Sequence, residues 1–114
     1  MRLEGDRMNY KTFIKKVERD LPLHLESLDE WERTMLFGFD FLFSKPKKTH
    51  IGIAALIFYE RHAEHPYQIL MYYITNGHSY GKEIYDVWVD TLTSAYNQIY
   101  EKLKELTEEV EVEK

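Results

Sequence analysis

Four histidines are the residues of this sequence best suited to bind a metal ion. His62 and His65 flank an Ala-Glu pair, and His50 and His78 add two further imidazoles. If residues 60–66 form a turn between two strands, His62 lies about 40 Å along the strand from His50. The histidines then fall into two separate pairs, whereas a zinc site needs three or four ligands. We predict polar turn residues, with no metal and no cofactor, and keep metal binding or pH sensing as the alternative.

The loop over residues 76–81 contains residue types that can hold a small ligand. Its candidate contacts are Gly77, His78, Ser79 and Gly81. The glycines permit close approach of the backbone, and the first amides of a following helix can bind an anion. However, the lysine of a phosphate-binding loop is missing, and two glycines also suit a sharp turn. A structural turn is the first interpretation, and a ligand loop is the alternative.

Residues for acid–base or nucleophilic catalysis do not form a recognisable set. Asp40 interrupts a phenylalanine-rich segment, where a carboxylate is either paired, near a sheet margin or poised in a pocket with a raised pKa. The chain has no cysteine, and its serines lack the context of a nucleophile elbow. Dinucleotide, zincin and calcium-loop motifs are also missing. The sequence therefore predicts no catalytic residue and favours a protein that is not an enzyme.

Two groups of basic residues are candidates for contact with nucleic acid. They are Lys11, Lys15 and Arg19, spaced along one side of an N-terminal helix, and Lys45, Lys47 and Lys48 in a turn. Lysine and arginine can neutralise phosphates, and exposed tyrosine or phenylalanine can stack on bases. The net charge of −5 and an acidic C-terminal helix would repel nucleic acid. Solvated lysines are therefore the first interpretation, and phosphate contact is the alternative.

Two helices are predicted to position these residues. The first covers residues 10–21, where apolar residues repeat at helical spacing between Asn9, a suitable N-cap, and Pro22, which ends a helix. The second is a long helix in which apolar residues continue from Ile84 to Leu106, with Ser79 as its N-cap. A fourth strand over residues 84–89 is the alternative, because the preceding Asn-Gly dipeptide suits a hairpin.

Three strands are predicted between the helices, over residues 35–43, 49–59 and 67–75. Alternating phenylalanines indicate the first, and β-branched and aromatic residues indicate the other two. Residues 23–32 are ambiguous, because Ser27 and Glu30 have the spacing of a capping box for a short helix. The predicted fold class is α+β: a two-layer, three-stranded antiparallel meander in the order α–β–β–β–α.

The composition indicates one domain. Residues 1–114 form it, with 1–8 as an extension and 108–114 as a frayed acidic tail, because a chain of 114 residues cannot divide its core. A charged N-terminus without an apolar core predicts a cytoplasmic protein with no membrane partner. Abundant Glu and Lys with few Asn and Gln resembles the composition of thermophile proteins, including small proteins of hyperthermophilic archaea and their viruses.

All three predicted strands are apolar on both faces, which is unusual in an antiparallel sheet. Either the two helices cover one face each, or they share a face and leave the other for a second copy. We predict a homodimer whose interface contains Phe37, Phe39, Phe41, Phe43, Ile53, Ile57, Tyr59 and Tyr73.

Three classes of function follow. The first is a non-enzymatic interaction or assembly protein that acts as a homodimer, for instance an accessory or inhibitory protein that docks on a larger complex. The second is a nucleic-acid-binding module that uses the basic stripe and the turn over residues 45–48. The third is a small-ligand binder or enzyme that uses the loop over residues 77–81. Only the first is supported by the apolar faces of the sheet.

Overall fold

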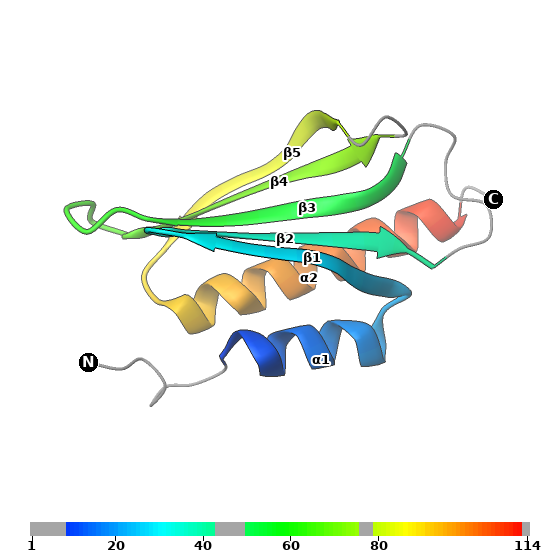
Figure 1. The fold of residues 1–114 in the computed structure, drawn as a ribbon, viewed down its shortest axis with the longest axis horizontal. Helices are drawn as coiled ribbons and strands as arrows, with labels where there is room; N and C mark the ends of the chain where they lie inside the picture. The colour runs from blue at the N-terminus through cyan, green and yellow to red at the C-terminus, as the bar shows by residue number, and fades with distance from the viewer. Residues whose placement is uncertain (1–8, 43–49, 76–78, 113–114) are drawn as a thin grey trace.

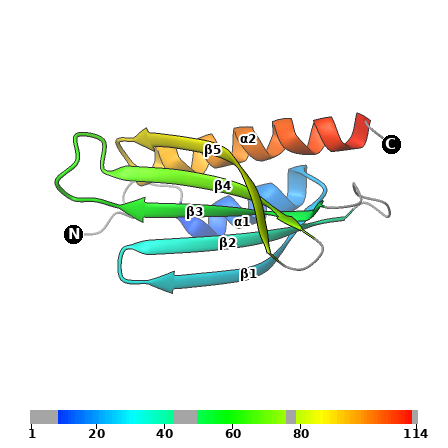
Figure 2. The ribbon, with the colours of Figure 1, turned by 90° about the horizontal axis from the view of Figure 1, so that it is seen from above.

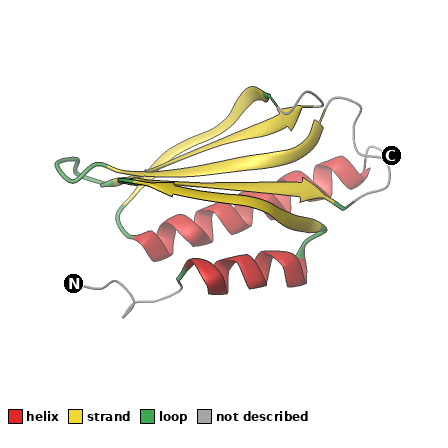
Figure 3. Cartoon of the chain, viewed as in Figure 1, coloured by secondary structure: helices red, strands yellow, loops and turns green. Residues whose placement is uncertain are grey.

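The computed structural model describes residues 9–42, 50–75 and 79–112. The elements are α1 (Tyr10–Asp20), β1 (Leu23–Trp31), β2 (Thr34–Phe41), β3 (His50–Tyr59), β4 (Tyr67–Thr75), β5 (Tyr80–Val89) and α2 (Leu92–Val112). The strands form one sheet in the order β1-β2-β3-β4-β5, each antiparallel to its neighbour. Both helices lie on the same face of this sheet, and the opposite face carries no helix (Figures 1 and 3).

The predicted α+β class with an antiparallel sheet is confirmed, but the three-stranded meander is wrong. The sheet has five strands, because β1 and β5 add to the two edges of the predicted three. The element order is therefore α–β–β–β–β–β–α.

The strand β1 replaces the ambiguous segment before β2. Its register against β2 shifts between Leu25 and Ser27, so one extra residue forms a bulge. The bulge places Leu25 opposite Phe39 and Leu28 opposite Phe37, so both leucines lie on the helix side although they are three residues apart. Spacing of three is also helical spacing, which explains why a short helix was plausible from the sequence.

The strand β5 replaces the first part of the predicted long helix. Its register places Tyr85, Val87 and Val89 on the helix side of the sheet, and Asp86 and Trp88 on the other side. Pairing with the edge of β4 favours the strand over a helix, because the backbone groups of this segment then form hydrogen bonds with those of β4. The alternative of a strand over residues 84–89 is thus the observed one.

The true start of α2 is capped by Thr91 rather than Ser79. The Ser94 amide donates to the Thr91 hydroxyl at 3.0 Å, and the Ala95 amide donates to the Thr91 carbonyl at 3.0 Å. Ser79 instead closes the connection between β4 and β5, because its carbonyl accepts from the Thr75 amide at 2.8 Å.

The helix α1 follows the sequence prediction. The Thr12 amide donates to the Asn9 side chain at 3.0 Å, which satisfies one free donor of the first turn. At the other end Leu21 is extended and its amide donates to the Val17 carbonyl, just before Pro22. The helix therefore begins and ends where its capping residues indicated.

The core lies between the helices and the sheet face they cover. Its centre is an aromatic cluster in which the Phe13 ring stacks on Tyr96 at 5.0 Å and meets Phe37 edge-on at 5.3 Å between centroids. Phe13 and Phe37 are fully buried. Because residues from α1, β2 and α2 meet in this cluster, it joins both helices to the sheet.

Candidate interaction surface

The sheet face without helices, called the open face from here on, is apolar along its centre. Alternation and register place two adjacent rows across all five strands. One row is Trp31, Thr34, Phe58, Gln68 and Trp88, and the next is Asp29, Leu36, Leu56, Leu70 and Asp86. In the second row, apolar residues therefore occupy the three inner strands and acidic residues lie on the edge strands, whereas in the first row the inner strands carry Phe58 between Thr34 and Gln68.

Large aromatic side chains are exposed around this centre. Trp31 on β1 is 49% exposed and Trp88 on β5 is 44% exposed. These are the two tryptophans of the whole chain. Large exposed aromatics around an apolar patch are typical of protein-binding surfaces, since water contact with such groups is unfavourable.

The first half of β5 bends over the open face. Its register against β4 shifts twice, around Tyr72. As a result this half of β5 rises away from the helices and, seen from above, passes over neighbouring strands (Figures 1 and 2). The Tyr80 ring stacks on Tyr72 at 5.5 Å between centroids. Bulges in strands commonly re-aim side chains in this way.

A cavity of about 270 Å³ lies beneath this bent strand, and we call it the Tyr80 pocket. It is lined by Glu26, Ser27, Leu36, Gly38, Asp40, Ala54, Ile74 and Tyr80. A Cβ at Gly38 would lie 2.6 Å from the Ser27 hydroxyl, so any larger residue there would have to displace the Ser27 side chain. The small side chain of Ala54 leaves further room, so the pocket is open above the middle of the sheet.

The open face is negatively charged. Asp29 and Asp86 flank the leucine row, and Glu26 and Asp40 line the Tyr80 pocket. Among the residues that the structure describes, the two rows and the pocket lining contain no lysine and no arginine. The pKa of the Tyr80 hydroxyl is raised by burial first, and then by the negative charge of Asp29. Side chains from the two edge strands thus act on each other across this face.

The residues predicted as a dimer interface lie mainly on the opposite face of the sheet, toward the helices. Phe37, Phe39, Phe41, Ile53 and Ile57 are buried in the core, and Tyr73 packs against it. Tyr59 is 38% exposed near the end of β3, and Phe43 lies outside the described residues. The chain's own helices therefore cover these side chains, whereas the open face carries no helix.

The remaining predicted ligand and phosphate contacts are not brought together. Gly77 and His78, like Lys45, Lys47 and Lys48, lie outside the described residues. Gly81 belongs to β5, and the helix amides expected beside it are absent from that position because α2 begins at Leu92. Lys11, Lys15 and Arg19 are exposed on α1.

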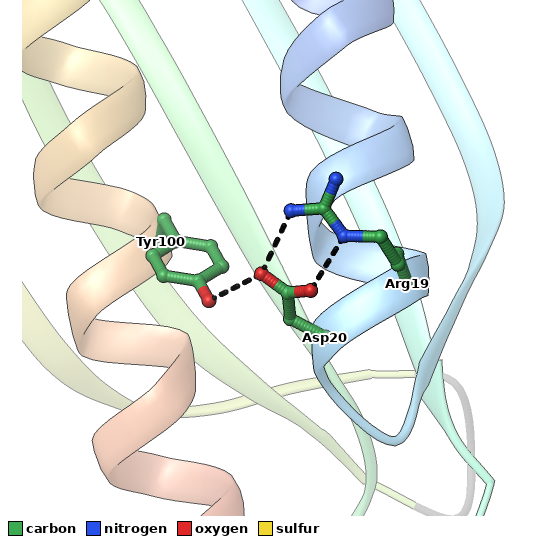
Figure 4. Close-up of polar contacts among 3 residues, drawn as sticks. All are labelled: Arg19, Asp20 and Tyr100. Carbon is green, nitrogen blue, oxygen red and sulfur yellow. Dashed lines mark hydrogen bonds and ion pairs between the residues drawn. The ribbon is translucent and has the colours of Figure 1, made fainter.

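Part of the basic stripe is used within the chain, at the end of α1 (Figure 4). The Arg19 guanidinium donates to the Asp20 carboxylate at 2.7 Å and 3.1 Å, and the Tyr100 hydroxyl donates to the same carboxylate at 2.9 Å. These bonds lower the pKa of Asp20 to about 2, with the Arg19 hydrogen bond as the largest cause. Asp20 therefore links α1 to α2.

Two of the predicted histidines make separate contacts. The His65 ring lies at hydrogen-bond distance from the Asp90 carboxylate, which raises the pKa of His65, and the His50 ring stacks on Tyr73 at 3.9 Å. In the described ranges no three His, Asp or Glu side chains are grouped so that they could hold a metal ion.

No protein-family model, curated protein or solved structure matches this chain. Neither helix, over the residues that the structure describes, is both long and apolar enough to cross a membrane. The open face, with its two tryptophans and the Tyr80 pocket, is therefore the best-defined candidate site.

Proposed function

We propose that this protein is a non-enzymatic interaction protein that docks another protein on its open face. The observation that carries the proposal is the exposure of Trp31 and Trp88 around an apolar centre. Nothing in the fold of the monomer requires two large aromatic side chains in water, so their position is best explained by contact with a partner.

The layout of the open face supports this role. Stable interfaces have an apolar centre and a polar rim, and aromatic residues are enriched in them. The leucine row has this form, because Leu36, Leu56 and Leu70 lie between Asp29 and Asp86. Five strands about 4.8 Å apart and about 30 Å long cover about 700 Å², which is close to the roughly 800 Å² that one partner contributes to a standard interface.

A homodimer, the form expected from the sequence, is the second candidate and would use the same surface. Its support is the apolar leucine row, which two copies could bury against each other. The negative charge of the open face disfavours such a dimer, because face-to-face packing brings the carboxylates of one copy toward those of the other. High salt would therefore strengthen such a dimer, since it screens the repulsion.

Site-specific photo-crosslinking tests the proposed function. A benzoylphenylalanine is placed at Trp88, and at the exposed Glu101 of α2 as the matched control. We expect discrete protein adducts from position 88 in native extracts and none from position 101. The adducts should disappear when Leu70→Lys places a charge in the leucine row. Equal labelling from both positions, or adducts that survive Leu70→Lys, would contradict the proposal.

A further inference from the structure

A larger cavity, of about 450 Å³, lies at one end of the core, and we call it the Tyr67 pocket. Its lining comes from the connection between β1 and β2, from the adjoining ends of β3 and β4, and from the first residue of α2. These segments meet at the same end of the molecule (Figure 1). A volume of several hundred Å³ is typical of pockets that bind small molecules.

The walls of the Tyr67 pocket are apolar and aromatic. Ile57 is 3% exposed and Met35 packs against the core, so these two side chains line the pocket from the helix side of the sheet. The rings of Tyr59 and Tyr67 lie 5.1 Å apart between centroids, and Leu92 of α2 completes the apolar lining. An aromatic ring suits these walls, because rings pack favourably on one another and on methionine sulfur.

A buried hydroxyl group lies beside the pocket. Tyr96 is 1% exposed, and its hydroxyl donates to the Met35 sulfur at 3.8 Å, although sulfur is a weak acceptor. The pKa of Tyr96 is raised by burial first and then by the negative charge of Glu30, which lines the pocket. Its hydroxyl oxygen can still accept a hydrogen bond, so a ligand with a donor group would give it a stronger partner.

The charged side chains of the lining carry both signs. They are the carboxylates of Glu30 and Glu32 and the guanidinium of Arg33, all on exposed residues. A guanidinium binds a carboxylate with two parallel hydrogen bonds, and a carboxylate accepts from an ammonium group. A ligand that carries both an ammonium and a carboxylate next to an aromatic ring therefore matches the walls and the charges together.

We propose that the Tyr67 pocket binds a free aromatic amino acid. The ring of the ligand packs against Tyr59, Tyr67 and Met35. Its ammonium group donates to the Glu30 carboxylate and to the Tyr96 hydroxyl oxygen, and its carboxylate accepts from Arg33. This inference goes beyond the docking of a protein on the open face, because the pocket lies at the end of the core.

Three small ligands test the proposal on the full chain: L-phenylalanine, phenethylamine, which lacks the carboxylate, and phenylpropanoate, which lacks the ammonium. We expect calorimetry to show that each analogue binds about tenfold more weakly than L-phenylalanine, because each loses a charge-assisted hydrogen bond. NMR of isotope-labelled methionine methyl groups locates the ligand. The Met35 signal should shift, whereas Met71, which is fully buried and does not line the pocket, is the internal control.

Variants assign the two charges. Glu30→Gln should weaken L-phenylalanine and phenethylamine about tenfold and leave phenylpropanoate unchanged, because only the first two carry an ammonium group. Arg33→Gln should weaken L-phenylalanine and phenylpropanoate and leave phenethylamine unchanged. Both residues are exposed and tolerant of replacement, which thermal unfolding verifies. Glu101→Gln is the matched control, because it removes an exposed carboxylate from α2 and should change no affinity.

Several outcomes would overturn the inference. They are a dissociation constant for L-phenylalanine weaker than about 1 mM, equal affinity for the three ligands, or phenethylamine as the tightest of them. A shift of Met71 without a shift of Met35 would place the ligand elsewhere and overturn it as well. Leu70→Lys, which disrupts the proposed docking face, should leave the binding of L-phenylalanine unchanged, so this inference and the proposed function can fail separately.

Discussion

Replacing Phe13 with alanine should remove much of the stability of this protein. Phe13 is fully buried on α1, and its ring contacts Tyr96, Phe37 and Phe39 at centroid distances of 5.0, 5.3 and 6.2 Å. Truncation therefore leaves a cavity at the point where both helices meet the sheet. The rings around it belong to two elements, β2 and α2, and cannot collapse into the space without moving a strand or a helix.

The expected loss follows from burial and ring contacts. Phe→Ala in a core costs about 3–5 kcal/mol, and each lost aromatic pair adds about 0.5–1.5 kcal/mol beyond burial. Phe13 belongs at the upper end, so we expect about 5 kcal/mol. A chain of 114 residues has a free energy of unfolding of about 6–17 kcal/mol. The variant should thus fold marginally, with Tm lower by about 20 °C.

Urea and thermal unfolding, followed by circular dichroism, measure this loss. Trp31→Ala is the matched control, because it removes a larger aromatic that is 49% exposed. We expect this control to cost less than about 1 kcal/mol, as surface replacements do. If Phe13→Ala costs no more than Trp31→Ala, the aromatic cluster does not hold α1 on the sheet and the description of the core is refuted.

Three further changes test individual contacts. Asp90→Asn should lower the pKa of His65 toward 6.5, and an NMR titration measures this shift. The pair of His65 and Asp90 stabilises the fold below pH 6.5, and this stabilisation is lost as the pH rises through the raised pKa. An unchanged titration of His65 in the variant would contradict this contact. Asp20→Asn should make unfolding less sensitive to acid, because the pKa of Asp20 in the folded state, about 2, lies below its ordinary value of 3.8. The stabilisation by the Asp20 carboxylate is complete above pH 3.8 and is lost as the pH falls toward 2. Identical acid-unfolding curves for the variant and the parent would exclude this contribution of Asp20. Thr91→Ala should lower the free energy of unfolding in urea by about 1 kcal/mol through loss of the α2 cap, whereas Ser79→Ala should not.

Local features were predictable where neighbours in the sequence decide the structure. The apolar stripe, Asn9 and Pro22 define α1, because helix formation and capping depend on residues within one turn. The three inner strands were predictable for a similar reason, since continuous apolar and β-branched segments bounded by turn residues favour buried strands. The acidic, cysteine-free composition likewise belongs to the sequence alone.

The edge strands were not predictable from local pattern. The bulge in β1 gives Leu25 and Leu28 a helix-like spacing, and the two shifts in β5 allow its apolar residues to fit a helical stripe. For both segments helix and strand were close alternatives. Pairing with β2 and β4 selects the strand, and although these partners are the next strands in the chain, the pairing and its bulges exist only once the sheet has formed.

The candidate site depends most on tertiary structure. That both faces of the sheet are apolar follows from the sequence, because Phe37 and Phe39 alternate with Leu36, and Ile57 alternates with Leu56 and Phe58. Which of the two faces is exposed does not follow from the sequence, since a helix could pack equally well on the apolar side chains of either face. The docking of α1 and α2 on one side buries the phenylalanines, and the leucine row lies on the face that carries no helix (Figure 1). The same docking leaves both tryptophans partly exposed, because both helices lie on the other face of the sheet.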